Sequence, residues 1–402
     1  MLILFKVIKI IMGSIKNKYL APLFNQKMNI NSVKYTQHHN SEFYKELKKR
    51  VNAYFKTNNI SKYGNTGMVV KSIFMILLYF VPLILILTVV EQSWLSLLLW
   101  VVAGFGMAGI GLSIMHDANH NAYSKHLFVN KFFGFLVNFV GGNDLNWRIQ
   151  HNVLHHTYPN VAGVDEDIDV DGLMRFSPNQ ERLKFHKYQH LYAWFLYGLL
   201  TINWFLRKDY QQIVRYNKMG LLTTQSITFK KAISLVIFTK IIYMFLTIAL
   251  PIWLAPTPWY ISVIGFVIMQ FVAGFLLSII FQSAHVLPTS EFPVPDESGN
   301  IESDWAINQL YNTANFAPKA KLLSWFVGGL NYQVEHHLFP NICHVHYKNI
   351  SKIVKETAIE YNLPYYSYAT FFGAIKDHAK LLKRLGKHDV LAPVAVKSNN
   401  EH

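Results

Sequence analysis

The sequence predicts an all-α, polytopic membrane protein with four transmembrane helices in two hairpins and a cytosolic helical cap. Composition is the first reason, since 51% of the 402 residues are hydrophobic and only 15% are charged. The second is a set of apolar runs that approach the roughly 20 residues needed to cross a bilayer. The third is a formal net charge of +15, with Lys and Arg crowded outside those runs, as in cytoplasmic segments of membrane proteins. Membrane topology therefore explains the charge, and no nucleic acid partner is expected.

Four spans are expected, at about residues 70–90, 95–114, 233–254 and 261–280. The connector inside each pair is short and contains no Lys or Arg, so each pair forms a tight helical hairpin. The positive-inside rule then places both termini and the long middle segment in the cytoplasm.

The same pattern divides the chain into three parts. Residues 1–67 form a basic cytosolic arm with a helical patch near residues 42–55, residues 68–350 form the main domain, and residues 351–402 form a cytosolic tail. The first dozen residues are apolar but include two lysines and lack a small-residue cleavage site, so no signal peptide is expected.

Two further apolar stretches, residues 127–140 and 191–206, are short for a span. If either crossed the membrane, histidines on its two sides could not share one site. We therefore expect both to lie at the membrane interface.

Three histidine clusters and one lone histidine border the apolar runs. Several of these histidines are spaced i and i+4, which places two side chains on one face of a helix. Gln333 stands four residues before the last histidine of the third cluster and is a further candidate. The candidate metal ligands are His116, His120, His151, His155, His156, His285, Gln333, His336 and His337.

Eight histidines are too many for one ion, which commonly takes four to six ligands, so they favour two ions held by the cap. Neutral imidazole suits iron, copper, zinc or nickel. Two iron ions activate O₂ and remove hydrogen from an unactivated carbon, whereas zinc has no redox chemistry. The single cysteine, Cys343, excludes an intramolecular disulfide and a cysteine-rich metal site.

Carboxylates near the clusters are candidates to hold the ligand histidines through their second ring nitrogen. They are Asp117, Glu335 and the acidic stretch that begins at Asp165, for which a solvated loop is an equal alternative. Trp147 and Tyr332 flank the clusters and either line a substrate tunnel or pack in the core. Arg148 either holds an acyl headgroup or is solvated.

Other histidines receive no ligand role. His186 and His190 are also spaced i and i+4, but flanking lysines favour a solvated helix face. His344 and His346 are expected to be structural or to lie outside the metal ligands. His38 and His39 lie in the basic arm, and no role is expected for them.

At these residues the chain resembles the membrane fatty acid desaturase family. The motifs are His116-Asp-Ala-Asn-His120, His151-Asn-Val-Leu-His155-His156 and Gly328-Gly-Leu-Asn-Tyr-Gln-Val-Glu-His-His-Leu-Phe-Pro340, and the match covers roughly residues 40 to 360. The resemblance implies a di-iron centre on the nine candidate ligands, O₂ as co-substrate, and an acyl-CoA or acyl-lipid substrate in the membrane. Residues 68–350 would be the desaturase domain.

Gln333, where many members have histidine, resembles the front-end group, which inserts a double bond between an existing one and the carboxyl end. That likeness implies a delta-6-like activity. Many eukaryotic front-end members carry a fused cytochrome b5 domain with a His-Pro-Gly-Gly motif, which does not occur in this sequence. We therefore expect a separate electron donor such as ferredoxin or cytochrome b5, and a location in a bacterial inner membrane.

Two alternatives stay open. A hydroxylase, or a sphingolipid or carotenoid oxidase, would use a similar metal site. A histidine-rich membrane receptor or metal transporter belongs to another class, but transporters need ionisable groups within their spans. Here Lys240 is the exception in spans that are nearly free of such groups. A zinc amidohydrolase would need about three ligands, not eight.

Overall fold

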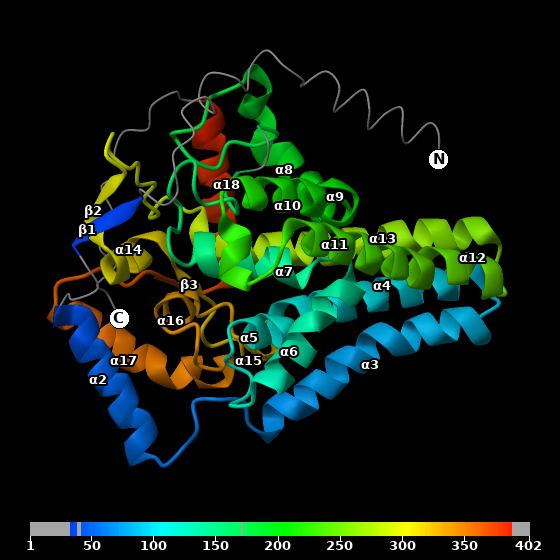
Figure 1. The fold of residues 1–402 in the computed structure, drawn as a ribbon, viewed down its shortest axis with the longest axis horizontal. Helices are drawn as coiled ribbons and strands as arrows, with labels where there is room; N and C mark the ends of the chain where they lie inside the picture. The colour runs from blue at the N-terminus through cyan, green and yellow to red at the C-terminus, as the bar shows by residue number, and fades with distance from the viewer. Residues whose placement is uncertain (1–32, 38–41, 170–171, 388–402) are drawn as a thin grey trace.

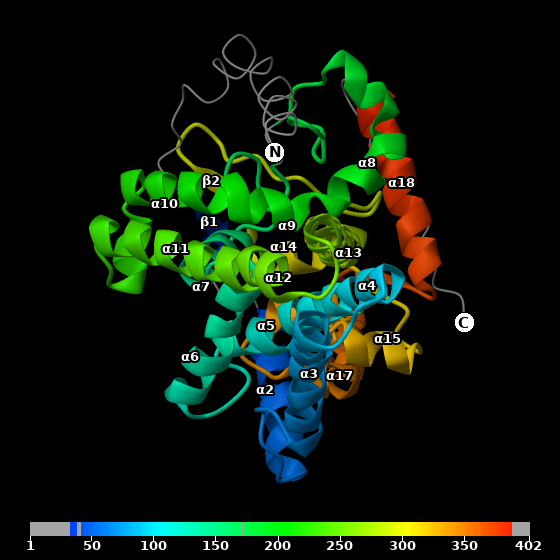
Figure 2. The ribbon, with the colours of Figure 1, turned by 90° about the vertical axis from the view of Figure 1, so that its right-hand side faces the viewer.

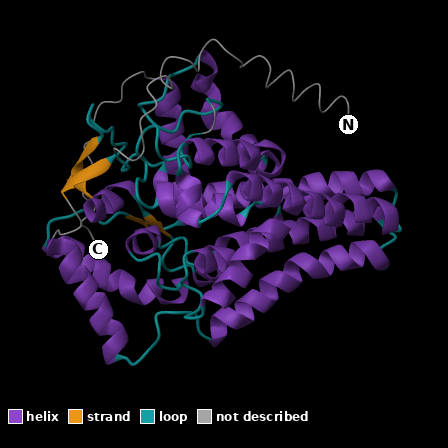
Figure 3. Cartoon of the chain, viewed as in Figure 1, coloured by secondary structure: helices purple, strands orange, loops and turns teal. Residues whose placement is uncertain are grey.

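The computed structural model describes residues 33–37, 42–169 and 172–387, and this part of the chain is largely helical (Figure 3). The expectations about a signal peptide and about His38 and His39 lie outside the described residues. The helical patch expected in the N-terminal arm is confirmed as α2 (Glu42–Thr57).

Within the described residues, four helical segments are long and apolar enough to cross a membrane, as predicted. They are α3 (Thr66–Thr88), the continuous segment Ser93–Asn119, the continuous segment Phe229–Leu254, and α13 (Trp259–His285). The second comprises α4 (Ser93–Gly109), η2 (Ile110–Ile114) and α5 (Met115–Asn119), and the third comprises α11 (Phe229–Met244), η8 (Phe245–Ala249) and α12 (Leu250–Leu254). The second and fourth segments extend beyond the predicted ends, which carries their helical backbone up to the histidines.

Close packing between these helices depends on small residues. Helix α4 lies between α3 and α13 (Figure 2). A Cβ atom added at Gly106 on α4 would lie 2.4 Å from the backbone nitrogen of Tyr79 on α3. Only glycine therefore lets the two backbones approach this closely.

The middle segment supplies shorter helices. The stretch 127–140 folds as α6 (Leu127–Phe135) and η3 (Leu136–Val140), and the stretch 191–206 is broken into α8 (Gln189–Gly198), α9 (Leu200–Asn203) and η6 (Trp204–Lys208). Neither is among the four candidate spans. Their place at the membrane interface stays a prediction. The other helices here are α7 (Asp144–Trp147), η4 (Arg148–His155), η5 (Lys184–Tyr188), α10 (Asp209–Lys218) and η7 (Leu221–Gln225).

The C-terminal third returns to the N-terminal arm. Helices α2, α14 (Trp305–Asn312), α16 (Gln333–Leu338) and α17 (Tyr347–Glu360) gather at the end of the molecule opposite the α3–α4 connector (Figure 1). Two short parallel pairs, β1 (Lys34–Gln37) with β2 (Asn300–Asp304) and β3 (Asn315–Phe316) with β4 (Ser367–Tyr368), tie distant segments together. The remaining elements are α15 (Lys321–Phe326), η9 (His344–His346) and α18 (Phe371–Lys387).

The expectation of a solvated helix face at His186 is wrong. Its side chain is buried, its Nδ1 accepts the backbone N–H of Leu183, and its Nε2 lies 2.9 Å from the carbonyl of Gly172. Helix α18 covers it: a Cβ added at Gly386 would lie 2.0 Å from the carbonyl oxygen of His186. His190 is half-buried.

Candidate metal centre

The nine predicted ligand residues come from four separate parts of the chain. The first cluster ends α5, the second occupies η4 and its C-terminal cap, His285 is the last residue of α13, and the third cluster lies on α16. All nine residues are buried, with at most 9% of the surface of each residue exposed. The fold therefore brings together residues that are more than 200 positions apart.

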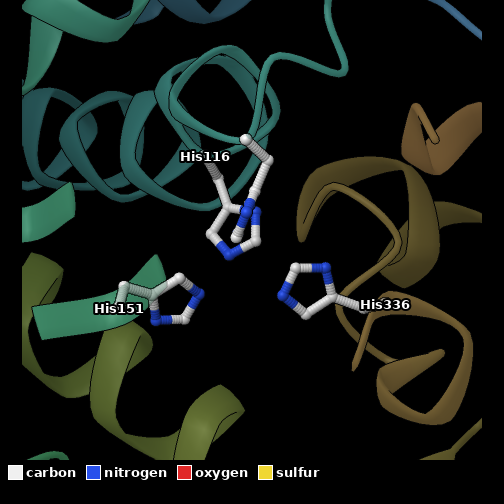
Figure 4. Close-up of side chains that lie close together, drawn as sticks. His116, His151 and His336 are labelled. Carbon is white, nitrogen blue, oxygen red and sulfur yellow. The ribbon is translucent and has the colours of Figure 1, made fainter. Parts of the chain in front are cut away.

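The first group gathers four histidines. Ring nitrogens of His116, His120, His151 and His336 all lie within 4.8 Å of one another. Figure 4 shows the rings of His116, His151 and His336 converging on one point from three elements. His156 Nε2 adjoins this group, 3.2 Å from His151 Nε2 and 3.0 Å from His336 Nε2.

The second group gathers His155, His285 and His337, whose ring nitrogens also lie within 4.8 Å of one another. In each ring Nδ1 already has an acceptor. His155 Nδ1 lies 2.9 Å from an oxygen of Asp165. His285 Nδ1 lies 3.1 Å from the Asn312 carbonyl, and His337 Nδ1 lies 2.8 Å from Gln309 Oε1.

The other nitrogen of each of these rings is left for a metal. Nε2 of His155, of His285 and of His337 is buried and has no hydrogen-bond partner among the described residues. A ring that donates its Nδ1–H keeps a lone pair on Nε2, which is how metal-bound histidines are usually oriented. A buried polar atom without a partner is costly, so these nitrogens fit a metal site. Gln333 Oε1 is also buried without a partner, and the side chain approaches His285.

The second cluster contributes histidines to both groups. Its segment η4 is wound as a π-helix rather than an α-helix, and the N–H of His156 donates to the carbonyl of His151. The side chains of His151 and His155 nevertheless lie side by side, as their spacing predicted, with stacked rings whose centroids are 5.2 Å apart. His151 then joins the first group and His155 the second. Such π-helical turns are rare in proteins overall, but those that occur are often found at functional sites. In contrast, His116 and His120 join the same group, as their spacing predicted.

Burial keeps most of these imidazoles neutral. Burial first, and then neighbouring histidines, hold the pKa values of His151, His156, His336 and His337 well below the usual range. Neutral imidazole is the form that binds metal. Burial also lowers the pKa of His155, but the adjacent Asp165 carboxylate outweighs it and raises that pKa overall.

The three predicted carboxylates have different partners. Asp165 contacts His155, and Asp167 of the same acidic stretch lies 3.6 Å from His151 Nδ1. Glu335 accepts hydrogen bonds from Asn315 and Tyr365, and burial raises its pKa to about 7.

Asp117 accepts a hydrogen bond from the ring of His344 at 2.7 Å and another from the Cys343 thiol at 3.0 Å. The ring of His344 also lies 2.6 Å from Lys71 Nζ. His346 Nε2 lies 3.1 Å from the carbonyl of Tyr63. Asp117 thus joins α5 to the segment that precedes α17.

Of the candidate substrate residues, Trp147 lies nearest the centre. The centroid of its ring is 4.5 Å from that of His151 and 5.4 Å from that of His116. Arg148 makes a 2.7 Å ion pair with Asp144 and donates to Gln225 and Asn119. The Tyr332 hydroxyl donates to the Pro318 carbonyl.

Sequence reasoning missed several residues that contact the ligands, among them Phe281, whose ring stacks on that of His285 with centroids 4.6 Å apart. Gln309 and Asn312 lie on α14, and Tyr347 begins α17 with its hydroxyl 3.1 Å from His336 Nδ1. Helix α14 is short, contains no histidine, and lies in sequence between His285 and the third cluster. Its residues carried no signal of their role, because only the tertiary fold brings them to the ligands.

Comparison with known proteins agrees with this geometry. The fatty acid desaturase family model matches residues 92–369. The chain belongs to the fatty acid desaturase family. It is an oxidoreductase that desaturates fatty acyl chains, and the buried histidine clusters of this desaturase fit an iron site.

By name, three similar proteins are desaturases of acyl-lipids. An sn-1 linoleoyl-lipid 6-desaturase from Arthrospira platensis is 36% identical over 85% of this chain and 92% of that protein. An enzyme of the same name from Synechocystis is 35% identical over 88% and 98%. An acyl-lipid (8-3)-desaturase from Physcomitrium patens is 34% identical over 88% of this chain and 74% of that protein.

Proposed function

We propose that this desaturase inserts a cis double bond at the sixth carbon of an acyl chain esterified to a membrane lipid. Two observations support this position and this carrier. Two relatives that share about a third of their residues over nearly their whole length are named linoleoyl-lipid 6-desaturases. Gln333 also stands at the front-end position of the third histidine cluster.

The observation that carries the proposal is the division of the ligands into two buried groups. We propose one iron ion in each group, with O₂ as co-substrate and two electrons from a separate protein donor. His116, His120, His151 and His336 would hold the first ion, and His155, His285 and His337 the second. His156 lies between them, with its ring centroid 4.6 Å from that of His336 and 4.4 Å from that of His337. Such an iron pair supplies an O₂-derived oxidant strong enough to remove hydrogen from an unactivated methylene.

The protein's own residues prepare this chemistry by fixing the ligands. Asp165, Gln309 and the carbonyl of Asn312 each hold one Nδ1–H, which aims the three Nε2 lone pairs at one point. We propose that the indole of Trp147, whose ring centroid lies 4.5 Å from that of His151, shields the first group from water. We propose that the carboxamide oxygen of Gln333 serves the second group, directly or through a water molecule.

The membrane arrangement extends the proposal. We place residues 1–67, the ligand groups and residues 351–402 on the cytosolic side, with residues 68–350 as the catalytic domain and a bacterial inner membrane as the location. The basic character of the segments outside the four apolar helices supports this orientation.

Product analysis tests the proposed function. The chain is expressed in a host that lacks polyunsaturated lipids and is fed linoleate, and fatty acid methyl esters are separated by gas chromatography with mass spectrometry. We expect a new ester with one more double bond, at the sixth carbon. His336→Ala should abolish it, whereas His190→Ala, which alters a histidine outside both groups, should leave it unchanged.

The other outcomes are equally distinct. A double bond at another carbon would keep the desaturase and correct the position. A hydroxylated ester would move the protein to the hydroxylase alternative. Failure to form any product in membranes that contain the iron-loaded protein and a functional donor would contradict the proposal.

A further inference from the structure

Two helices next to the first ligand group carry lysines on their exposed faces. Helices α2 and α17 pack against each other, joined by the Arg50–Glu360 ion pair and by a hydrogen bond from Asn349 to the Tyr54 hydroxyl. Their buried sides share one apolar core. The exposed lysines of the two helices are Lys45, Lys48, Lys49, Lys56, Lys348, Lys352 and Lys355.

The spacing places these charges in stripes. Lys348, Lys352 and Lys355 follow one another at i, i+4 and i+7, so they share one face of α17. Lys45, Lys49 and Lys56 are spaced i, i+4 and i+11, which also places them on one face of α2. Glu46 pairs with Lys49 and Arg50, and Glu360 pairs with Arg50 between the helices. Glu42 and Glu356 are the other acidic residues of α2 and α17, so the eight Lys and Arg residues of the two helices outnumber their four Glu residues. The lysine surface, as we name these two stripes, is therefore net positive.

This surface lies unusually close to the metal ligands. Tyr347, the first residue of α17, is 1% exposed, and its hydroxyl lies 3.1 Å from His336 Nδ1. The next residue, Lys348, is exposed. The side chain of Tyr347 and its contact with His336 are therefore all that separates the exposed residue Lys348 from a ligand of the first group. Figure 1 shows α2 and α17 at the end of the molecule opposite the α3–α4 connector.

We propose that the lysine surface is the docking site for the electron donor, an acidic one-electron carrier protein. This inference rests on the proposed function, which needs such a donor. Desaturation removes two hydrogen atoms from the acyl chain. Together with two electrons and two protons they reduce one O₂ to two waters. The carrier delivers the two electrons in two encounters and is oxidised once in each. Positive surfaces speed the encounter with acidic partners and make it dependent on salt.

Helix α18 provides a matched control surface. It also carries exposed lysines, among them Lys376, Lys383 and Lys387. It lies on a different side of the molecule from α17 in both views (Figures 1 and 2). Reversing three charges there changes the net charge by the same amount, but leaves the lysine surface intact.

The test measures electron transfer apart from desaturation. The full chain, loaded with iron and oxidised to the ferric state so that the iron can accept electrons, is placed in nanodiscs of zwitterionic lipid, so anionic lipid plays no part. The probe is a reduced plant-type [2Fe–2S] ferredoxin, and stopped-flow absorbance follows its oxidation without O₂. The first variant is Lys348→Glu with Lys352→Glu and Lys355→Glu. The second variant is Lys45→Glu with Lys49→Glu and Lys56→Glu. It is used to test the docking site if the first variant does not retain iron. The control is Lys376→Glu with Lys383→Glu and Lys387→Glu.

We expect the lysine-surface variants to lose about tenfold or more in the second-order rate at low salt, and the wild-type rate to fall as salt rises. Product formation with dithionite and methyl viologen should stay unchanged, because small reductants need no dock. An equal loss in the α18 control, or unchanged ferredoxin oxidation in the lysine-surface variants, would overturn the docking site. Absence of product with the small reductants in the wild type would instead contradict the proposed function.

Discussion

A histidine ligand depends on both of its ring nitrogens. In the second group, Asp165, Gln309 and Asn312 each occupy one nitrogen and leave the other facing the shared point. The partners thereby fix the tautomer and the direction of each ring, which is the part of metal binding that the protein controls. Changes to these partners should therefore alter metal affinity before they alter folding.

We predict that Asp165→Asn lowers iron affinity by about 10- to 100-fold. The amide no longer attracts the Nδ1–H of His155 with a full charge, so the ring is held less firmly. Iron content after dialysis against graded chelator concentrations measures the change. Asp377→Asn, which alters a surface ion pair with Lys380, is the matched control and should keep wild-type iron. Equal iron retention in both variants would refute the role of Asp165.

A second prediction concerns Lys240, a charged residue near the middle of the third span. Its ammonium is buried, forms an ion pair with Asp209, and donates to the carbonyls of Gly141 and Gly142. Lys240→Met leaves the Asp209 carboxylate buried without its counter-charge, which should cost about 3–5 kcal/mol of stability. Adding Asp209→Leu should restore much of that loss. Denaturant unfolding in detergent measures both, and a double variant no more stable than the single one would contradict the pairing.

At the scale of elements, helix winding and helix contact decide where the ligands point. His151 and His155 lie side by side on the π-helix η4, at the boundary between the two groups. The close approach of α3 and α4 at Gly106 holds the segment that ends in His116 and His120. Both features act on the site through the backbone.

We predict that Gly106→Ala destabilises the protein by about 1–3 kcal/mol. The added methyl group meets the backbone of Leu78 and Tyr79, which cannot move aside as a side chain does. Gly111→Ala is the control, since its methyl group would meet only the flexible side chain of Leu277. Thermal unfolding of both variants in detergent is the measurement. A Gly106→Ala protein as stable as the control would show that α3 and α4 do not depend on this contact.

The four spans and the histidine clusters could be predicted from the sequence, because length, apolarity and spacing are local properties. The π-helical winding of η4 could not be predicted. In so short a segment, the α and π forms differ only in whether each N–H bonds to the carbonyl four or five residues earlier. The roles of Gln309 and Tyr347 could not be predicted either, because these roles depend on contacts between segments that are distant in sequence. Burial of His186 was missed for the same reason, since its cover is Gly386 on α18.

At the scale of the whole molecule, the metal ions would act as links between segments far apart in sequence. The ligands come from α5, η4, α13 and α16. Any metal that binds only the folded arrangement stabilises it by mass action. The metal-free protein would have to bury unpartnered ring nitrogens and should be less stable.

We predict that removing iron with a chelator lowers the melting temperature by several degrees or more, and that ferrous iron restores it. Differential scanning fluorimetry in detergent measures the shift. A variant that lacks His155, His285 and His337 together should show a smaller shift on chelation. A melting temperature that does not respond to iron in the wild type would contradict the linking role.

Iron stoichiometry tests the central claim, that two histidine groups hold two iron ions, most directly. Purified full-length protein is measured by inductively coupled plasma mass spectrometry beside His120→Ala, which alters the first group, and His285→Ala, which alters the second. We predict about two irons per chain in the wild type and about one in each variant. A wild-type value near one, or complete loss of iron in one variant with none lost in the other, would contradict the two-group account.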